Sequence, residues 1–236
     1  MITYLKKCLG AVIDFVYPNI CRICKSPNER FVCQKCLELL PYISEPYCQR
    51  CAVGLRYGGE FCINCEKSRF FVEFIRAAFS YEGVVRRLIL EFKYQKKIYI
   101  GKFLANLVCD YMERNNIRFP IDLIMPVPLH NVTFRERGFN QSEVVGDIVS
   151  KYLGLPLKTD VVRRIRKTKP QYLLNREARK SNLANAFVVE DYRSVKNKNV
   201  LLIDDIATSL STFNEVARVL KEAGAADIFG LAIAKD

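Results

Sequence analysis

Two adjacent carboxylates offer the clearest chemistry in this chain of 236 residues. Asp204 and Asp205 directly follow the apolar run VLLI at 200–203, which predicts a buried strand. Ionised carboxylates only accept hydrogen bonds, so an adjacent pair suits the two vicinal hydroxyls of a ribose. In an open parallel sheet, ligands bind beyond the carboxyl ends of the strands. We therefore expect the acid pair to face a bound ligand.

A hydroxyl-rich loop follows the acid pair and leads into an expected helix. The first N–H groups and the partial positive charge of such a helix suit a phosphate group, and side-chain hydroxyls add further donors. The acids and the loop together favour a site for a phosphoribosyl group. The hydroxyls belong to Thr208, Ser209, Ser211 and Thr212.

Three other interpretations compete with a phosphoribosyl site. A Walker-B-like acid pair of a nucleotide hydrolase requires a G-x-x-x-x-G-K-[ST] loop, and the sequence contains none. A phosphoacceptor aspartate of a receiver-like domain stays open, although it leaves the hydroxyls unexplained. The purely structural alternative is a strand-to-helix turn that is capped by Ser or Thr.

Eight of the ten cysteines fall into four C-x-x-C pairs. Each pair presents two thiolates on one side of a turn, and two such turns complete a tetrahedron around Zn²⁺. The metal would supply folding energy that so short a segment cannot draw from apolar burial. Sequential pairing gives two structural sites, whereas interleaved pairing or a single occupied site stays open. The first site would use Cys21, Cys24, Cys33 and Cys36, and the second Cys48, Cys51, Cys62 and Cys65.

A disulfide module is the alternative for these cysteines. It would fit a secreted protein, but residues 1–17 lack a signal-peptide pattern, because Asp14 interrupts the apolar run and no small-residue cleavage site follows. Disulfides are rare in the cytosol, so we expect zinc and a cytoplasmic location. The N-terminal segment is expected to pack on the protein as a helix, with a peripheral membrane contact as the alternative. Cys8 and Cys109 are expected in the core.

The composition favours an anionic partner. The formal net charge is +12, the pI is near 9.3, and half of the residues are apolar. Nucleic acid, a phosphorylated metabolite or an acidic membrane face would each match this charge, and a basic protein without such a partner is the alternative. No stretch reaches the roughly 18 consecutive apolar residues of a transmembrane helix.

Beyond residue 70 the sequence alternates between strand and helix signals, which predicts a parallel sheet covered by helices. Residues 1–70 are expected to form a helix and the zinc module, and residues 71–236 an α/β domain. Strands are expected at 75–81, 121–128, 186–189, 200–203 and 228–234, helices at 84–93, 99–115, 142–154 and 212–224, and loops at 129–141 and 166–185.

Three blocks of sequence closely resemble the ComF family of competence-associated proteins. They read MPVPLHNVTFRERGFNQSEVVGDIV at 125–149, RRIRKTKPQYLLNREARKSNLANAF at 163–187 and VLLIDDIATSLST at 200–212. The cysteine pairs and LILEFKYQKK at 88–97 precede them, so the resemblance extends from Cys21 to the C-terminus. It implies a type I phosphoribosyltransferase fold, a parallel sheet flanked by helices, behind an N-terminal zinc-ribbon-like module.

The resemblance also implies a site for phosphoribosyl pyrophosphate (PRPP) with Mg²⁺. Asp204 and Asp205 would hold the ribose, and Lys93 and Arg137 would act catalytically by stabilising the departing charge. Mg²⁺ would keep mostly water and phosphate oxygens as ligands. The only histidine, His130, is not expected to act as a base, because no orienting partner is evident. Further implied PRPP contacts come from Tyr94, Arg135, Asn140, Gln141, Ala207, Thr208, Ser209, Leu210, Ser211 and Thr212, with Arg179 and Asn182 in a mobile hood.

At Leu210 the chain departs from the family pattern, which usually has glycine there. Glycine permits a positive φ and a close approach of the backbone to phosphate. A left-handed leucine costs on the order of 1–2 kcal/mol, which phosphate contacts can offset if the side chain points away from the ligand. We therefore expect a retained phosphate pocket with weaker or altered affinity, which affects turnover more than binding.

Two functions follow from these features. An enzyme, a pentosyltransferase, would pass the phosphoribosyl group from PRPP to an amine or base and release pyrophosphate; the sequence does not specify the acceptor. The alternative is a non-catalytic protein that handles single-stranded DNA, or contacts the DNA-uptake machinery, with PRPP as a regulator. Aromatic residues beside cations, which hold single strands by stacking, occur in RYGG at 56–59, RFFVEFIR at 69–76 and FKYQKK at 92–97.

Overall fold

The computed structural model describes residues 20–28, 31–68, 70–166 and 183–236. The chain forms two compact units, residues 1–41 and 42–236. The described part of the first unit contains the short helix α2 (Gln34–Glu38) and an isolated bridge between Ile20 and Pro27. The second unit contains the sheet and the second group of cysteines. The boundary at residue 70 stays a prediction. No helix among the described residues is long and apolar enough to cross a membrane.

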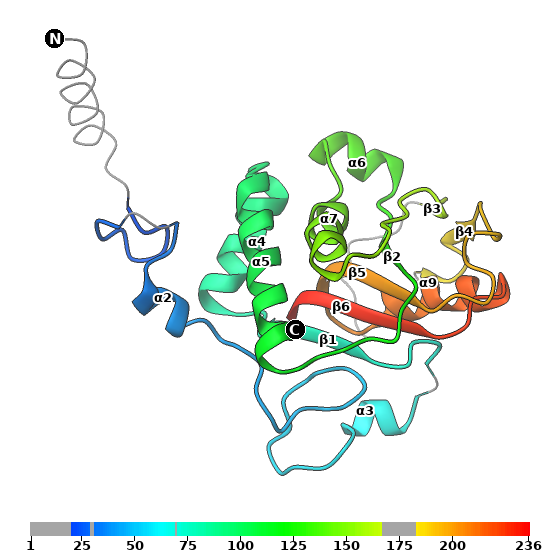
Figure 1. Cartoon of the computed structure of the whole chain (residues 1–236), viewed down its shortest axis with the longest axis horizontal. Coiled ribbons are helices and arrows are strands. Elements are labelled where there is room, and N and C mark those ends of the chain that lie inside the picture. Colours follow the sequence, from blue (N-terminus) through cyan, green and yellow to red (C-terminus); the bar gives the residue numbers. More distant parts are fainter. Residues whose placement is uncertain (1–19, 29–30, 69, 167–182) are drawn as a thin grey trace, which may run out of the picture. The chain divides into compact units, whose positions relative to one another are not determined.

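A four-stranded parallel sheet with the order β1–β6–β5–β2 forms the centre of the second unit (Figure 1). In the register, Asp204 of β5 pairs with Ala232 of β6, and Ile203 pairs with Pro126 of β2. Because all four strands run in the same direction, their carboxyl ends meet at one edge, where the acid pair lies. The predicted parallel sheet is confirmed. The strands are β1 (Ile75–Ser80), β2 (Leu123–Pro126), β5 (Val200–Ala207) and β6 (Ile228–Lys235).

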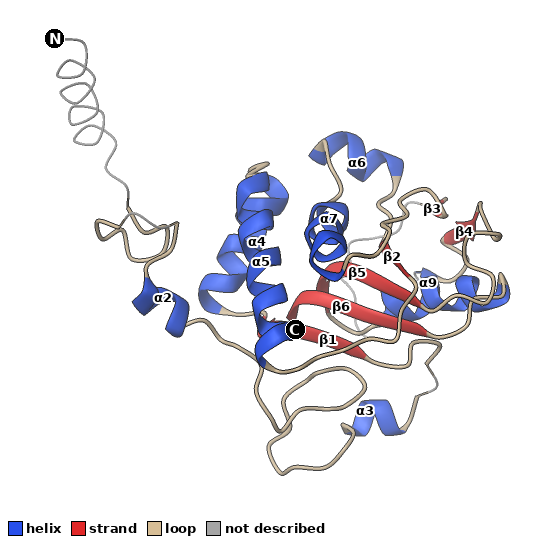
Figure 2. Cartoon of the chain, in the orientation of Figure 1, coloured by secondary structure: helices blue, strands red, loops and turns tan. Residues whose placement is uncertain are grey.

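Helices pack on both faces of this sheet (Figure 2). Side chains along a strand alternate between its faces, and those of β5 reach different helices. Leu202 belongs to the core cluster that contains Phe213, whereas Ile203 lies against Gly146. The helices are α4 (Gly83–Tyr94), α5 (Ile98–Arg114), α7 (Gln141–Leu153) and α9 (Ser211–Glu222), of which α7 carries Gly146 and α9 carries Phe213.

The segment at 129–141 contains a helix, so the prediction of a loop there was wrong. Helix α6 (Asn131–Arg137) begins after His130, whose Nδ1 accepts a hydrogen bond from the backbone N–H of Val132 at 3.3 Å. It ends at Gly138, which has φ 82°. None of the α6 residues is buried. Without an apolar stripe the segment lacks the periodic signal that identified the other helices.

The predicted strand at 186–189 forms, but outside the central sheet. Strand β4 (Phe187–Val189) pairs in the antiparallel sense with β3 (Val162–Arg164), a strand that the sequence pattern did not indicate. Three residues are too few for alternation to stand out from chance. Helix α7 also begins one residue earlier than predicted, because the side chain of Asn140 caps it by accepting a hydrogen bond from the N–H of Ser142.

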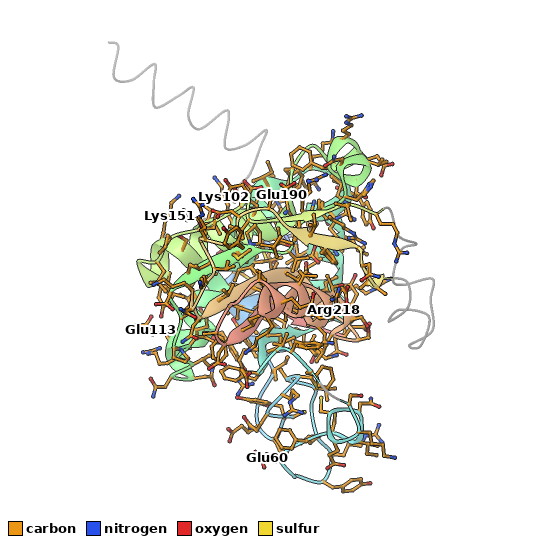
Figure 3. All side chains as sticks on the ribbon, turned by 90° about the vertical axis from the view of Figure 1, so that its right-hand side faces the viewer. Glu60, Lys102, Glu113, Lys151, Glu190 and Arg218 are labelled. Atoms are coloured by element: carbon orange, nitrogen blue, oxygen red, sulfur yellow. The ribbon has the colours of Figure 1, made fainter. Side chains whose placement is uncertain are left out.

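The second group of cysteines belongs to the same core as the sheet. Cys48 and Cys65 are buried in the cluster that contains the β-strand residues, and the short helix α3 (Ile63–Glu66) carries Cys65. The backbone N–H of Ile75 in β1 donates to the carbonyl oxygen of Arg50 at 2.7 Å. Glu60 marks this module beneath the sheet in Figure 3.

Candidate functional site

The acid pair lies inside β5 near its carboxyl end and is held by two helices. The hydroxyl of Ser142, at the start of α7, donates to Oδ1 of Asp204 at 3.0 Å. The backbone N–H of Asp205 donates to the same oxygen at 2.9 Å. Nζ of Lys93, in the last turn of α4, forms an ion pair with Oδ1 of Asp205 at 2.9 Å. The structure therefore brings the two predicted acids and the predicted lysine together.

Burial changes the acidity of Asp204. The pKa of Asp204 is raised from 3.8 to about 7 overall, mainly because burial removes hydration and secondly because of the negative charge of Asp205. The nearby Lys93 ammonium and the hydrogen bonds from Asp205 and Ser142 lower it again in part. A carboxyl group with this pKa gains from any ligand that donates hydrogen bonds to its charged form.

The turn between β5 and α9 is left-handed at Leu210, the conformation that a glycine at this position would permit. Leu210 is the N-cap of α9 and adopts φ 61° and ψ 0°, in the left-handed region. Only 6% of its surface is exposed, and it belongs to the core cluster with Phe213. As expected, the leucine side chain points into the core. Leucine therefore adopts the left-handed conformation here, which is expected to lower the stability of the fold by about 1–2 kcal/mol.

Several donors surround this turn. The Oγ atoms of Ser209 and Ser211 lie 2.8 Å apart, and Nζ of Lys235 donates to the carbonyl oxygen of Thr208 at 2.9 Å. Helix α9 has 12 residues, and its first N–H groups have no acceptor within the helix. The turn therefore offers hydroxyl and backbone donors to an anion.

The end of α4 and the segment between α6 and α7 lie beside each other at the acid pair. The guanidinium carbon of Arg137 lies 5.4 Å from the centre of the Tyr94 ring. Its Nη1 donates to Oε1 of Gln141 at 2.8 Å, and Gln141 precedes Ser142 in α7. Arg137 thus links the end of α4, where Tyr94 follows Lys93, to the start of α7, where Gln141 precedes the serine that binds Asp204.

Two other predicted site residues have a different position. The side chain of Asn140 is buried and makes structural contacts: Nδ2 donates to the carbonyl oxygen of Val127 at 3.1 Å, and Oδ1 accepts from the N–H of Ser142 at 3.1 Å. Arg135 is exposed on α6. Arg179 and Asn182 lie outside the described residues, as does Cys8, whereas Cys109 is buried as predicted.

Sequence reasoning missed two residues of this neighbourhood. Ser142 was expected only as the first residue of the helix at 142–154. Arg164 falls in a basic run that resembles a solvated face, but its guanidinium lies 5.5 Å from the Phe187 ring centre. Burial lowers the pKa of Arg164, and the charge of Asp204 opposes that shift. Arg163 is exposed and Arg164 is half-buried, but this alternation spans only three residues, so the sequence held no clear signal for Arg164.

The eight paired cysteines form two groups of four with the geometry of zinc sites. In each group the sulfur atoms lie within 4.8 Å of one another, which confirms sequential pairing. Sγ of Cys24 and Cys33 are 3.7 Å apart, and those of Cys51 and Cys62 are 3.8 Å apart. Tetrahedral Zn–S bonds of about 2.3 Å separate two sulfurs by roughly 3.8 Å, so the sulfur positions fit the metal.

Backbone donors favour the thiolate form of one buried cysteine in each group, Cys21 and Cys48, whereas burial raises the pKa of Cys36 and Cys51 to about 12. Burial raises the pKa of Cys21, but hydrogen bonds from the N–H groups of Cys33 and Cys24 lower it to about 6 overall. The pKa of Cys48 is lowered to about 7 in the same way, with the N–H of Cys62 as the main donor. Thiolates are the form that binds zinc, and no coordination position is left for a substrate, as in structural sites.

Comparisons with known proteins agree with both parts of the chain. Residues 12–66 match the family described as a double zinc ribbon domain, and residues 140–235 match the phosphoribosyl transferase domain family. Competence protein F of Haemophilus influenzae is 32% identical over 207 residues, which cover 85% of this chain and 88% of that protein. Competence protein ComFC of Streptococcus pneumoniae is 25% identical over 225 residues, covering 88% of this chain and 96% of that protein.

Among solved structures, glutamine PRPP amidotransferase from B. subtilis, complexed with ADP and GMP, aligns with a TM-score of 0.39 and 15% identity. The alignment covers 60% of this chain and 30% of the amidotransferase chain.

The two cysteine groups are expected to differ in what their loss does to stability. Cys48→Ser should release one zinc ion and lower the free energy of unfolding of the α/β body by several kcal/mol, because Cys48 is buried in its core. Cys24→Ser should release one ion without lowering the unfolding midpoint of that body, since Cys24 belongs to the first unit. Zinc quantification and urea unfolding followed by far-UV circular dichroism check both. Equal destabilisation by the two variants would contradict the expectation.

The raised pKa of Asp204 predicts a pH dependence of stability. Because its folded-state pKa of about 7 exceeds the ordinary value of 3.8, Asp204 stabilises the fold below pH 3.8, and this contribution is lost as the pH rises through about 7. Asp204→Asn cannot ionise, so its stability relative to the wild type should increase between about pH 5 and about pH 8. Urea unfolding of ligand-free protein at both pH values measures this. Asp122→Asn, at the amino end of the sheet, is the control; a parallel pH profile for wild type and Asp204→Asn would refute the burial argument.

Proposed function

The chain belongs to the ComF family of competence proteins, and on that basis we propose that it binds PRPP with Mg²⁺ in the cytoplasm and acts in DNA uptake. The proposal includes transfer of the phosphoribosyl group to an amine or base. One observation carries it: the buried Asp205 and the half-buried Asp204, a lysine and a helix N-terminus with hydroxyl donors meet at the carboxyl edge of a parallel sheet.

Each part of PRPP has a chemical partner in this arrangement. Asp204 and Asp205 accept hydrogen bonds from the ribose hydroxyls, and the turn at 208–212 donates to the 5′-phosphate. Lys93 and Arg137 then lie toward the diphosphate on C1. Mg²⁺, held mostly by water and phosphate oxygens, would neutralise part of the diphosphate charge.

The proposed reaction breaks the bond between C1 and the diphosphate oxygen. The electron pair leaves with pyrophosphate, and the nitrogen lone pair of the acceptor forms the new bond to C1. Positive charge develops on the ribose ring in the transition state, where the two adjacent carboxylates stabilise it. Lys93 and Arg137 stabilise the negative charge that develops on pyrophosphate. Arg137 suits this role because its planar guanidinium can donate two hydrogen bonds to a phosphoryl group.

Binding of PRPP is expected to depend on Asp205. A ligand at one hundred times its Kd stabilises the folded state by about 2.7 kcal/mol, which raises the melting temperature by several degrees. PRPP with Mg²⁺ should stabilise the wild type in this way, and Asp205→Asn should lose the effect, because an amide has one acceptor oxygen instead of two. Differential scanning fluorimetry measures both, with Asp122→Asn as the matched control.

An absent shift in the wild type, or an unchanged shift in Asp205→Asn, would overturn the proposed site. Transfer is tested separately by pyrophosphate release that depends on an added amine or base. Binding without such release would limit the function to PRPP recognition.

A second candidate function, handling of single-stranded DNA, is favoured by one feature of the zinc module. Tyr57 is 98% exposed, and its neighbours Arg56 and Gly58 are also exposed. An exposed aromatic ring beside a cation suits base stacking. Relatives of this chain bear the name DNA utilization protein YhgH, including one from Escherichia coli strain K12.

This candidate predicts single-strand binding that weakens steeply with salt, because released counterions drive such association. Tyr57→Ala should weaken binding by about 1–3 kcal/mol, the value of one stacked base. Fluorescence anisotropy of a labelled oligothymidylate across a salt series measures both effects. Tyr192→Ala, at another exposed tyrosine with an arginine beside it, is the control. Salt-independent binding, or equal losses in the two variants, would argue against this function.

A further inference from the structure

The ion pair between Lys93 and Asp205 engages one of the two carboxylate oxygens that would accept the ribose hydroxyls in the proposed site. Nζ of Lys93 lies 2.9 Å from Oδ1 of Asp205, and the side chains are 14% and 9% exposed. A second ion pair from the same region joins Lys97 and Glu91 at 2.7 Å. It is more exposed to solvent, because its side chains are 31% and 26% exposed. The pair at the site is thus the more desolvated of the two.

Separating a desolvated ion pair is unfavourable unless each charge finds a new partner. A ribose diol that binds Asp205 displaces the ammonium group, which is then a poorly hydrated cation. Ribose 5-phosphate brings no group for that cation, because its single phosphate binds at the turn on the other side of the sugar. PRPP brings a diphosphate on C1, which can take the place of the carboxylate.

We propose that Lys93 determines specificity by exchanging its partner, leaving Asp205 for the diphosphate of PRPP, so that the site rejects ribose phosphates that lack this group. The inference rests on the proposed PRPP site and adds a selectivity to it. In the ligand-free protein the ion pair competes with every ribose ligand. The diphosphate alone compensates for its loss, so only a ligand with both groups binds well.

This role predicts opposite effects of one substitution on two ligands. In Lys93→Met no ion pair opposes the diol, so ribose 5-phosphate should bind as tightly as in the wild type or more tightly. PRPP should bind more weakly, because it loses a charge-assisted hydrogen bond. The ratio of the two affinities should fall by about tenfold to one hundredfold, the value of such a bond. Isothermal titration calorimetry with each ligand at one Mg²⁺ concentration measures the ratio.

The matched control is Lys97→Met, which removes the ion pair with Glu91 and should leave the ratio unchanged. Lys93→Gln guards against misfolding, because its amide can still donate to Asp205 without a charge, and it should move the ratio in the same direction. Circular dichroism confirms that the variants are folded.

The outcomes separate the two proposals. If wild type prefers PRPP but Lys93→Met and Lys93→Gln keep the same ratio, the exchange is wrong while the PRPP site stands. An equal loss of affinity for both ligands would mean that Lys93 only supports Asp205, and it would also overturn the inference. If neither ligand binds the wild type, the proposed site falls and the inference falls with it.

Discussion

The placement of two adjacent carboxylates, Asp204 half-buried and Asp205 buried, near the end of β5 is the constraint on which the rest of the site depends. Charges that lose their hydration require compensation nearby. Asp204 receives it from the hydroxyl of Ser142 and Asp205 from Lys93, and these partners come from different helices. Both α4 and α7 must therefore present one end at the same edge of the sheet. The parallel strand order fixes that edge, and the Arg137 contacts with Tyr94 and Gln141 hold the two helix ends together.

The second cysteine group lies in the segment that covers one edge of the same sheet. β1 is an edge strand, and unpaired backbone groups along an edge invite pairing with other chains. Residues that precede β1 cover part of this edge: Ile43 donates its N–H to the carbonyl of Ala78, and Arg50 accepts from Ile75. Cys48, between these positions, lies in the common core. Metal bound there would fix the covering segment by coordination, where few apolar side chains are available.

The sequence predicted the central fold and the acid pair because both have strong local signals. The long apolar strands, the amphipathic pattern of α9 and the four C-x-x-C pairs can each be identified without knowing any distant contact. The sequence did not predict the exposed helix α6, the strand β3 or its pairing with β4, because periodicity is too weak over such short lengths. Within the site, the contacts of Ser142 and Arg164 depend on tertiary placement across more than fifty residues, which residue type alone does not encode. Asn140, which was expected to contact PRPP, instead caps α7, and this role also depends on tertiary placement.

Because of Leu210, the conformation of the turn between β5 and α9 depends on how the core is packed. A glycine at this point would let the turn vary while the core evolved independently. The leucine side chain instead shares the core cluster with Phe213, so the turn and the packing beneath it are one structural unit. Natural variation at the apolar positions under α9 is therefore coupled to the conformation of this turn. Lineages that keep this leucine should change those positions together, and lineages with glycine are free to change them one at a time.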